Sequence, residues 1–363
     1  YKPMSLPPNE LSPGKIILLG SGEIAPSARK IYDWLFKQLS PPVNVAILET
    51  PAGFEPNSAA VAGQVGLYLE KRLQNYKPQV TVVPARKRGT SFSPDDPEIA
   101  TPVRSADVIF MGPGSPTYAV RQLQDSYVWN ALRARHHLGA SVIFSSAATL
   151  ACSEQTLPVY EIYKVGEELH WKPGLNFFDD YGLSLILIPH WNNSDGGDAL
   201  DTSRCYMGEK RYNALCELLP PDVQRASTIV GIDENTALVI DPAAATCWVL
   251  GQGRVSITRA GQEEIYGSDA TLPMDALGAF RLPSLGDVLP PRLYQDLAQQ
   301  QAGQPEEPAQ AVDTPPEVMD LVQQRAQARA NKQWDLADDL RDAIAAAGWQ
   351  LMDTPDGPNL EPL

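Results

Sequence analysis

The sequence has few cysteines, few histidines and no surplus of positive charge. Its 363 residues include four cysteines and four histidines, with 29 basic residues against 44 acidic ones. The cysteines form no Cys-x-x-Cys pair and no closely spaced framework, which favours a reduced, cytoplasmic protein without disulfides. The formal net charge of −15 argues against a broad nucleic-acid-binding surface, because an acidic surface repels polyanions.

Long hydrophobic runs are also lacking. No apolar stretch approaches the ~20 residues of a membrane-spanning helix, and residues 1–14 contain no apolar core of a secretory signal. We therefore expect no membrane partner. The composition, 43% hydrophobic and 20% charged, is typical of a globular chain and excludes a wholly disordered one.

Short apolar runs alternate with amphipathic helical stretches in the first half of the chain. Apolar strands separated by helices form parallel sheets that are covered on both faces. The sequence therefore predicts an α/β fold with a doubly wound, mostly parallel sheet. The expected strands are 15–20, 43–50, 79–83, 107–111 and 141–145, and the expected helices are 27–39, 57–76 and 117–138.

A β-rich extension follows the alternating strands and helices, and the composition of the chain changes after this extension. The last three of its strands lie close together with turn residues between them, so we expect antiparallel hairpins. We expect a first domain over 1–283, a Pro/Gln/Ala-rich linker over 284–316 and a small helical hairpin over 317–363. The extension has expected strands at 183–189, 228–232, 236–240, 247–251 and 255–259, and an expected helix at 208–219.

Three segments that follow expected strands could carry chemistry. Ser146 lies on a sharp turn between a strand and a helical stretch, where helix N–H groups can stabilise an oxyanion; packing or capping is the commoner use of such a turn. The Gly-Pro-Gly-Ser loop at 112–115 can present N–H groups to an anion or can be a plain tight turn. His190 ends a strand, where parallel sheets place reactive groups, and a structural histidine is the alternative.

A dinucleotide-binding loop is the competing enzyme hypothesis. Gly20-Ser-Gly22-Glu-Ile-Ala25 follows the first strand, and Glu49 ends the second strand as the ribose-binding acid would. Against this hypothesis, the match is short and Pro26 follows it at once.

In their order along the chain, the segments resemble the serine peptidase family of aspartyl dipeptidase and cyanophycinase, which has a class I glutamine-amidotransferase-like fold. The resemblance covers about residues 14–260. It implies a serine hydrolase that cleaves peptide or isopeptide amide bonds next to aspartyl units, with no cofactor and no metal. Its motifs are Gly112-Pro-Gly114-Ser115, Phe144-Ser-Ser146-Ala-Ala148-Thr, Pro189-His190-Trp191 and Gly231-Ile-Asp233-Glu234-Asn-Thr236-Ala-Leu-Val239.

The resemblance implies Ser146 as the nucleophile and His190 as its general base. The N–H groups of Gly114 and Ala147 would form the oxyanion pocket. A carboxylate located between serine and histidine in the sequence should orient the imidazole, and we expect Glu161, with Glu154 as the alternative.

An aspartyl substrate needs cationic and polar groups around its carboxylate. The candidates follow the glycine loop and the histidine, and pairing of these arginines with surface acids is the equally open alternative. The expected substrate-binding residues are Arg121, Asn192, Arg204 and Arg211.

Two residues depart from the family pattern: Phe144 and Ala148 stand where relatives have glycines. Bulk beside the nucleophile could reshape or block the pocket. The alternative function is therefore a catalytically silent relative that acts as a binding or regulatory module linked to tRNA or translation.

The tail, at 321–341 and 348–354, resembles the C-terminal helical end of cysteinyl-tRNA synthetase. Arg325, Arg329 and Lys332 share one helical face and could contact tRNA phosphates. Residues 317–363 contain four basic and nine acidic residues, which favours a protein contact instead. A homodimer is left open.

Overall fold

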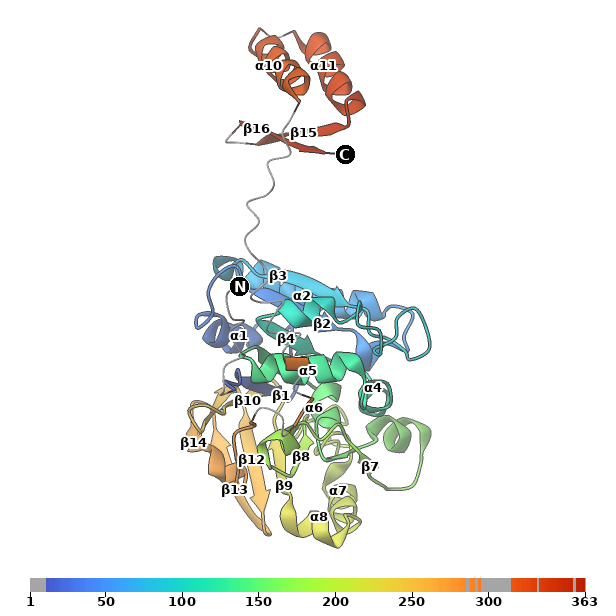
Figure 1. Cartoon of the computed structure of the whole chain (residues 1–363). Coiled ribbons are helices and arrows are strands. Elements are labelled where there is room, and N and C mark those ends of the chain that lie inside the picture. The colour runs from blue at the N-terminus through green and yellow to red at the C-terminus, as the bar shows by residue number, and fades with distance from the viewer. Residues whose placement is uncertain are drawn as a thin grey trace. The chain divides into compact units, whose positions relative to one another are not determined.

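The computed structural model describes residues 11–284, 288–290, 293–294, 315–331, 333–354 and 357–362. The chain divides into two compact units, Tyr1–Ala302 and Gly303–Leu363 (Figure 1). The boundary falls inside the expected linker.

An eight-stranded sheet forms the centre of the first unit (Figure 1). Its strands are β1 (Ile16–Leu19), β2 (Asn44–Leu48), β3 (Gln79–Val83), β4 (Val108–Met111), β5 (Ser141–Ser145), β10 (Thr236–Asp241), β11 (Thr246–Gly251) and β14 (Thr271–Pro273). Their order is β14-β11-β10-β1-β5-β4-β2-β3. Strands β1 to β5 run parallel to one another, whereas β10, β11 and β14 pair antiparallel.

Helices cover both faces of this sheet because its central strands are apolar on both sides. Ile16 and Leu18 of β1 belong to one hydrophobic core and Ile17 and Leu19 to the other, as the two-residue period of a strand requires. One core is covered by α3 (Thr101–Ser105), α4 (Pro116–Leu123) and α5 (Tyr127–His137), and the other by α1 (Ala28–Phe36) and α2 (Ser58–Arg72). The predicted doubly wound α/β fold is confirmed.

The helix expected over 117–138 is interrupted. It forms α4 and α5, because Asp125 adopts a left-handed conformation at φ 59° and Ser126 caps the second helix. The Ser126 hydroxyl accepts a hydrogen bond from the Trp129 N–H at 3.2 Å.

A second sheet lies beside the first. It contains β8 (Leu185–Ile188), β9 (Thr228–Ile232), β12 (Arg254–Arg259) and β13 (Gln262–Gly267), in the order β13-β12-β9-β8. The prediction of a hairpin between 247–251 and 255–259 is wrong. These strands do not pair, because the chain leaves β11 and enters the other sheet at β12. Gly251 at φ 121° and Gly253, whose Cβ would lie 2.6 Å from the Asp233 Cβ, direct this crossing.

Shorter elements complete the first unit. They are α6 (Ala147–Ala151), α7 (Gly208–Glu217), α8 (Pro221–Ala226), β6 (Gln155–Thr156), β7 (Lys172–Pro173), and the single helical turns η1 (Thr50–Ala52), η2 (Gln74–Tyr76), η3 (Glu161–Val165), η4 (Phe177–Tyr181) and η5 (Met274–Leu277).

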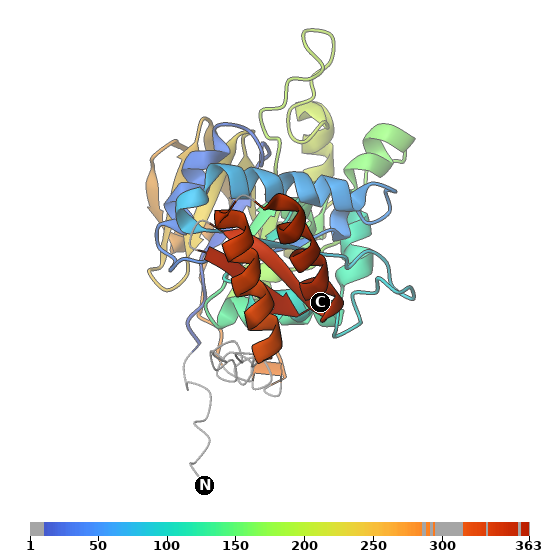
Figure 2. The same ribbon diagram turned by 90° about the horizontal axis from the view of Figure 1, so that it is seen from above.

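The second unit contains the expected helical pair and, in addition, a hairpin that the sequence did not suggest. Helices α10 (Pro316–Ala330) and α11 (Trp334–Ala346) lie side by side, and α11 contacts the antiparallel pair β15 (Trp349–Thr354) and β16 (Gly357–Pro362) (Figures 1 and 2). Across the described parts of the chain, none of the helices is both long enough and apolar enough to span a membrane.

The carboxyl end of β1 is the place where three later segments meet. The Leu19 carbonyl accepts a hydrogen bond from the Ser146 N–H, and the Gly20 carbonyl accepts one from the His190 N–H, both at 3.2 Å. The Gly20 N–H donates to the Thr236 carbonyl at 2.9 Å. A Cβ on Gly20 would lie 2.1 Å from the Asp233 carbonyl oxygen, so no larger residue fits without displacing the turn between β9 and β10.

Replacing Gly20 with alanine should therefore destabilise the first unit by at least ~1–3 kcal/mol, the usual cost of overpacking. The control is Gly63→Ala in α2, where a Cβ meets no atom within 4 Å and where alanine favours the helix by up to ~1 kcal/mol. Urea unfolding followed by tryptophan fluorescence measures both changes. Equal stability of the two variants would contradict the packing described for Gly20.

Candidate active site

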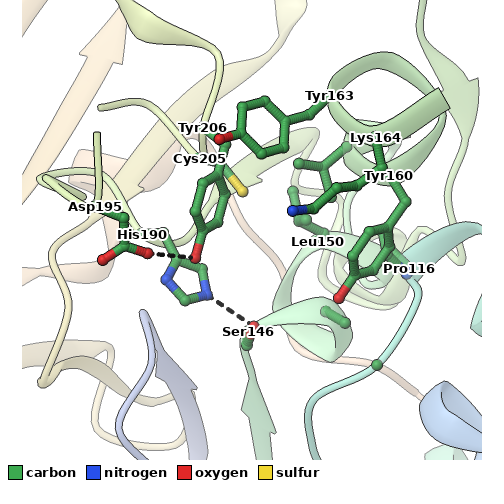
Figure 3. A pocket seen from close by; sticks show the side chains of 13 residues that line it. Pro116, Ser146, Leu150, Tyr160, Tyr163, Lys164, His190, Asp195, Cys205 and Tyr206 are labelled. Atoms are coloured by element: carbon green, nitrogen blue, oxygen red, sulfur yellow. Dashed lines mark hydrogen bonds between the residues drawn. The ribbon is translucent and has the colours of Figure 1, made fainter. Parts of the chain in front are cut away.

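A cavity of about 400 Å³ opens beside the turn between β5 and α6. Ser146 and His190 line it, and Tyr160 and Lys164 lie across the cavity from His190 (Figure 3). The site therefore lies at the carboxyl end of a parallel strand, where α/β folds place ligands.

Ser146 occupies a strained turn. Its backbone has φ 53° and ψ −111°, which is unfavourable for a residue with a side chain, and such strain costs about 1–3 kcal/mol. The hydroxyl of Thr149 holds the turn from behind, since it contacts the carbonyl oxygens of Leu19 and Phe144 at 2.9 Å each. The strain presents the Ser146 hydroxyl to the cavity.

His190 reaches the serine from a distant part of the chain. Its Nε2 lies 2.9 Å from the Ser146 Oγ (Figure 3). Its Nδ1 lies 2.7 Å from the Oε1 of Glu234. A carboxylate only accepts hydrogen bonds, so Nδ1 carries the proton and Nε2 is free to accept the serine proton.

Glu234 is held ionised. The hydrogen bond from His190 lowers the pKa of its carboxyl group, and a second bond from the Asn193 amide, at 2.9 Å, acts in the same direction. The backbone N–H of Glu234 donates to the Asn192 Oδ1 at 2.8 Å, which fixes the turn that carries the carboxylate.

The two carboxylates expected beside His190 are elsewhere. Glu161 accepts a hydrogen bond from Thr117 at 2.5 Å and pairs with Lys172 at 3.6 Å. Glu154 accepts hydrogen bonds from two serine hydroxyls near β8. The expectation that the acid precedes the histidine in sequence is thus corrected, because the carboxylate at His190 comes from the later turn between β9 and β10.

The motif that carries Glu234 was visible in the sequence, at residues 231–239, but no role followed from it. Asn193 gave no signal of its own, because asparagine in a polar loop is common.

Gly114 and Ala147 line the cavity together with Ser146. Gly114 has φ 144°, and a Cβ there would lie 2.1 Å from the Pro51 carbonyl oxygen, so the close approach requires glycine. Ala147 begins α6, and its N–H has no partner within the helix. Both residues, which the sequence analysis names as oxyanion donors, thus lie on the same cavity wall as Ser146.

Phe144 does not fill the cavity, contrary to the expected bulk beside the nucleophile. Its side chain is fully buried, and the centre of its ring lies 5.1 Å from that of Phe177 and 6.4 Å from that of Trp129. Ala148 is also buried in the same core. The two departures from the family pattern are therefore accommodated in the core behind Ser146.

The expected substrate-binding residues lie outside the cavity wall. Arg121 is exposed and stacks over Tyr118, Arg204 stacks over Trp191, and Arg211 donates to two backbone carbonyls. Asn192 supports the Glu234 turn instead. The cation that lines the cavity is Lys164.

One further pair of groups lies beside the imidazole. The Tyr206 hydroxyl donates to Asp195 at 3.3 Å, and the Tyr206 ring centroid is 5.6 Å from that of His190 (Figure 3). Burial, and then the charge of Asp195, raises the pKa of the Tyr206 phenol, which stays protonated.

The dinucleotide hypothesis is contradicted. Gly20 packs against the Asp233 backbone, and Glu49 is buried and occupied by an ion pair with Arg86 at 2.6 Å and a hydrogen bond from Ser58. Neither group is available to a cofactor.

The chain is similar in fold to the crystal structure of a peptidase from an acI-B1 Actinobacterium. The TM-score is 0.57 at 21% identity, and the match covers 73% of this chain and 98% of that one. The likeness is one of fold.

Residues 311–357 match the family of the cysteinyl-tRNA ligase anticodon binding domain. The tail carries this domain. Cysteine–tRNA ligase 1 of Burkholderia lata is 50% identical over 50 residues, which are 14% of this chain and 11% of the ligase. The cysteine–tRNA ligase of Chlamydia pneumoniae is 47% identical over 53 residues, 15% and 11% of the two chains. The chain thus spans about a tenth of the length of these curated relatives.

Proposed function

We propose that this protein is a serine hydrolase that cleaves peptide or isopeptide amide bonds. The observation that carries the proposal is the chain of contacts from Ser146 through His190 to Glu234, at 2.9 and 2.7 Å, on the wall of an open cavity.

In the proposed reaction the Ser146 oxygen attacks the carbonyl carbon while the His190 Nε2 takes its proton. The imidazolium then gives this proton to the leaving amine, and an acyl-enzyme ester forms. Water, deprotonated by the same nitrogen, cleaves the ester and restores the serine. Glu234 holds the Nδ1–H tautomer and stabilises the imidazolium.

The negative charge that develops on the carbonyl oxygen needs donors. The N–H groups of Gly114 and Ala147 are our candidates, and one such donor is typically worth about 3–4 kcal/mol of transition-state stabilisation.

The substrate we propose is a small peptide with an aspartyl unit. The family resemblance supplies the aspartyl preference, and Lys164 on the cavity wall is the cation that would pair with the side-chain carboxylate. It replaces the arginines expected from the sequence in this role.

Ser146→Ala should abolish labelling by a fluorophosphonate probe, because the probe reacts only with an activated serine. The control is Ser145→Ala, since Ser145 is fully buried and its hydroxyl donates to Glu23 at 3.0 Å. We expect the control to label within a few-fold of the native rate, as read by intact-protein mass spectrometry. Labelling of Ser146→Ala at the native rate, or no labelling of the native protein, would contradict the proposed nucleophile.

We also propose that the tail contacts tRNA, on the strength of its match to an anticodon binding domain. The expected basic face needs correction, because Arg325 is buried, at 7% exposure. Lys332 and the side chain of Arg329 lie outside the described residues.

Truncation after residue 302 should weaken the binding of a cysteine tRNA transcript at least ten-fold in 50 mM salt, because it removes the matched domain. Filter binding of the full chain and the truncated chain measures this change, and a repeat at 200 mM salt shows the share of phosphate contacts. Equal affinities would dismiss the tRNA contact.

A further inference from the structure

A second cavity, also of about 400 Å³, lies back to back with the one that holds Ser146. It is bounded by α7, α8 and the strands β9, β12 and β13. Two pairs of consecutive residues separate the cavities. His190 lines the first cavity and Trp191 the second, and Cys205 lines the first whereas Arg204 lines the second.

This common wall is a tightly bonded pair of turns. The Arg204 N–H donates to the Trp191 carbonyl at 2.9 Å, and the Cys205 N–H donates to the His190 carbonyl at 3.1 Å. Arg204, Cys205 and Tyr206 are consecutive residues with left-handed backbones, at φ 55°, 58° and 67°. Such backbones persist only where their surroundings hold them, and these hydrogen bonds connect the Arg204–Cys205 backbone directly to that of His190 and Trp191.

The second cavity has an apolar floor. Trp191 and Tyr212 are each 8% exposed, and Leu219 is 4% exposed. The Arg204 guanidinium lies 3.9 Å from the centre of the Trp191 ring. In the described part of the chain, Arg204 has no carboxylate within the 4.0 Å of an ion pair.

Glu209 and Glu263, which are both exposed, line the edge of the same cavity with their carboxylates. The cavity thus combines one half-buried cation, two acids and an apolar floor. A small zwitterion matches this set: its carboxylate would pair with Arg204, its ammonium group with the acids and its apolar side chain with Leu219.

We propose that this cavity is a second binding site for an apolar amino acid or short peptide with free amino and carboxyl groups, and that its occupancy changes the position of His190. The binding site stands on its own observations, whereas the regulatory consequence rests on the proposed hydrolase function. Hydrolysis of a peptide releases molecules of this class, so the site would respond to product.

Calorimetric titration of the full chain with L-leucine tests the site. We expect binding that N-acetyl-L-leucine and L-leucinamide lack, since each has lost one of the two charges. Arg204→Gln should weaken binding at least ten-fold, the usual effect of losing a charge-assisted pair. The matched control is Arg225→Gln on α8, which is exposed and lines neither cavity.

A second variant tests the site independently, in case Arg204→Gln does not fold. Asn213 is an exposed residue of α7 on the cavity wall, and Asn213→Trp should fill the space and abolish binding without altering Arg204. Binding should also survive fluorophosphonate modification of Ser146, which occupies only the first cavity. The proposed binding site would be overturned if the native chain did not bind L-leucine. It would also be overturned if modification of Ser146 removed the binding, or if both variants bound as the native chain does.

The coupling is measured from the rate of fluorophosphonate labelling with and without saturating L-leucine. We expect at least a three-fold change in the native chain and none in Arg204→Gln. The ¹⁵N chemical shifts of the His190 ring give a reading that needs no catalysis, and they should move on L-leucine addition. Shifts that stay fixed would overturn the coupling; a chain that binds L-leucine but never labels would overturn the hydrolase function alone.

Discussion

The hydrogen bonds at the carboxyl end of β1 are the constraint on which the site depends. Leu19 and Gly20 accept from the N–H groups of Ser146 and His190, and Gly20 donates to Thr236, two residues after Glu234. Strand β1 pairs with β5 on one side and β10 on the other. Segments separated by more than 40 residues thus converge within hydrogen-bond distance because one strand end holds all of them.

Backbone strain is concentrated around that strand end. Ser146, His190 and the run from Arg204 to Tyr206 all have positive φ angles. Each such residue costs about 1–3 kcal/mol, and the buried cores on both sides of the sheet supply the stability that maintains them. These backbones place the serine hydroxyl and the imidazole within hydrogen-bond distance of each other, which is the arrangement that the proposed nucleophilic attack requires.

Local patterns predicted the sheet and marked Ser146 and His190 as candidates, because a strand that ends in a small or polar residue is visible within a few positions. Glu234 could not be found in that way. Its approach to His190 depends on the antiparallel pairing of β10 with β1, which is a non-local property. The orientation of Phe144 toward the core and the crossing of the chain from β11 to β12 likewise depend on packing between distant elements. The arginines expected to bind substrate do not line the cavity for a related reason. Proximity in sequence to His190 says little about which side of its loop a side chain occupies.

The proposed chemistry depends most on Glu234, which would orient His190 for the activation of Ser146. The most direct measurement is the fluorophosphonate labelling rate of Glu234→Gln compared with Glu161→Gln, each shown to be folded by circular dichroism. We expect a loss of about 10⁴-fold for Glu234→Gln, as for amide replacement of a triad carboxylate, and a rate within a few-fold of native for Glu161→Gln. The reverse order, or equal rates for the two variants, would contradict this role of Glu234.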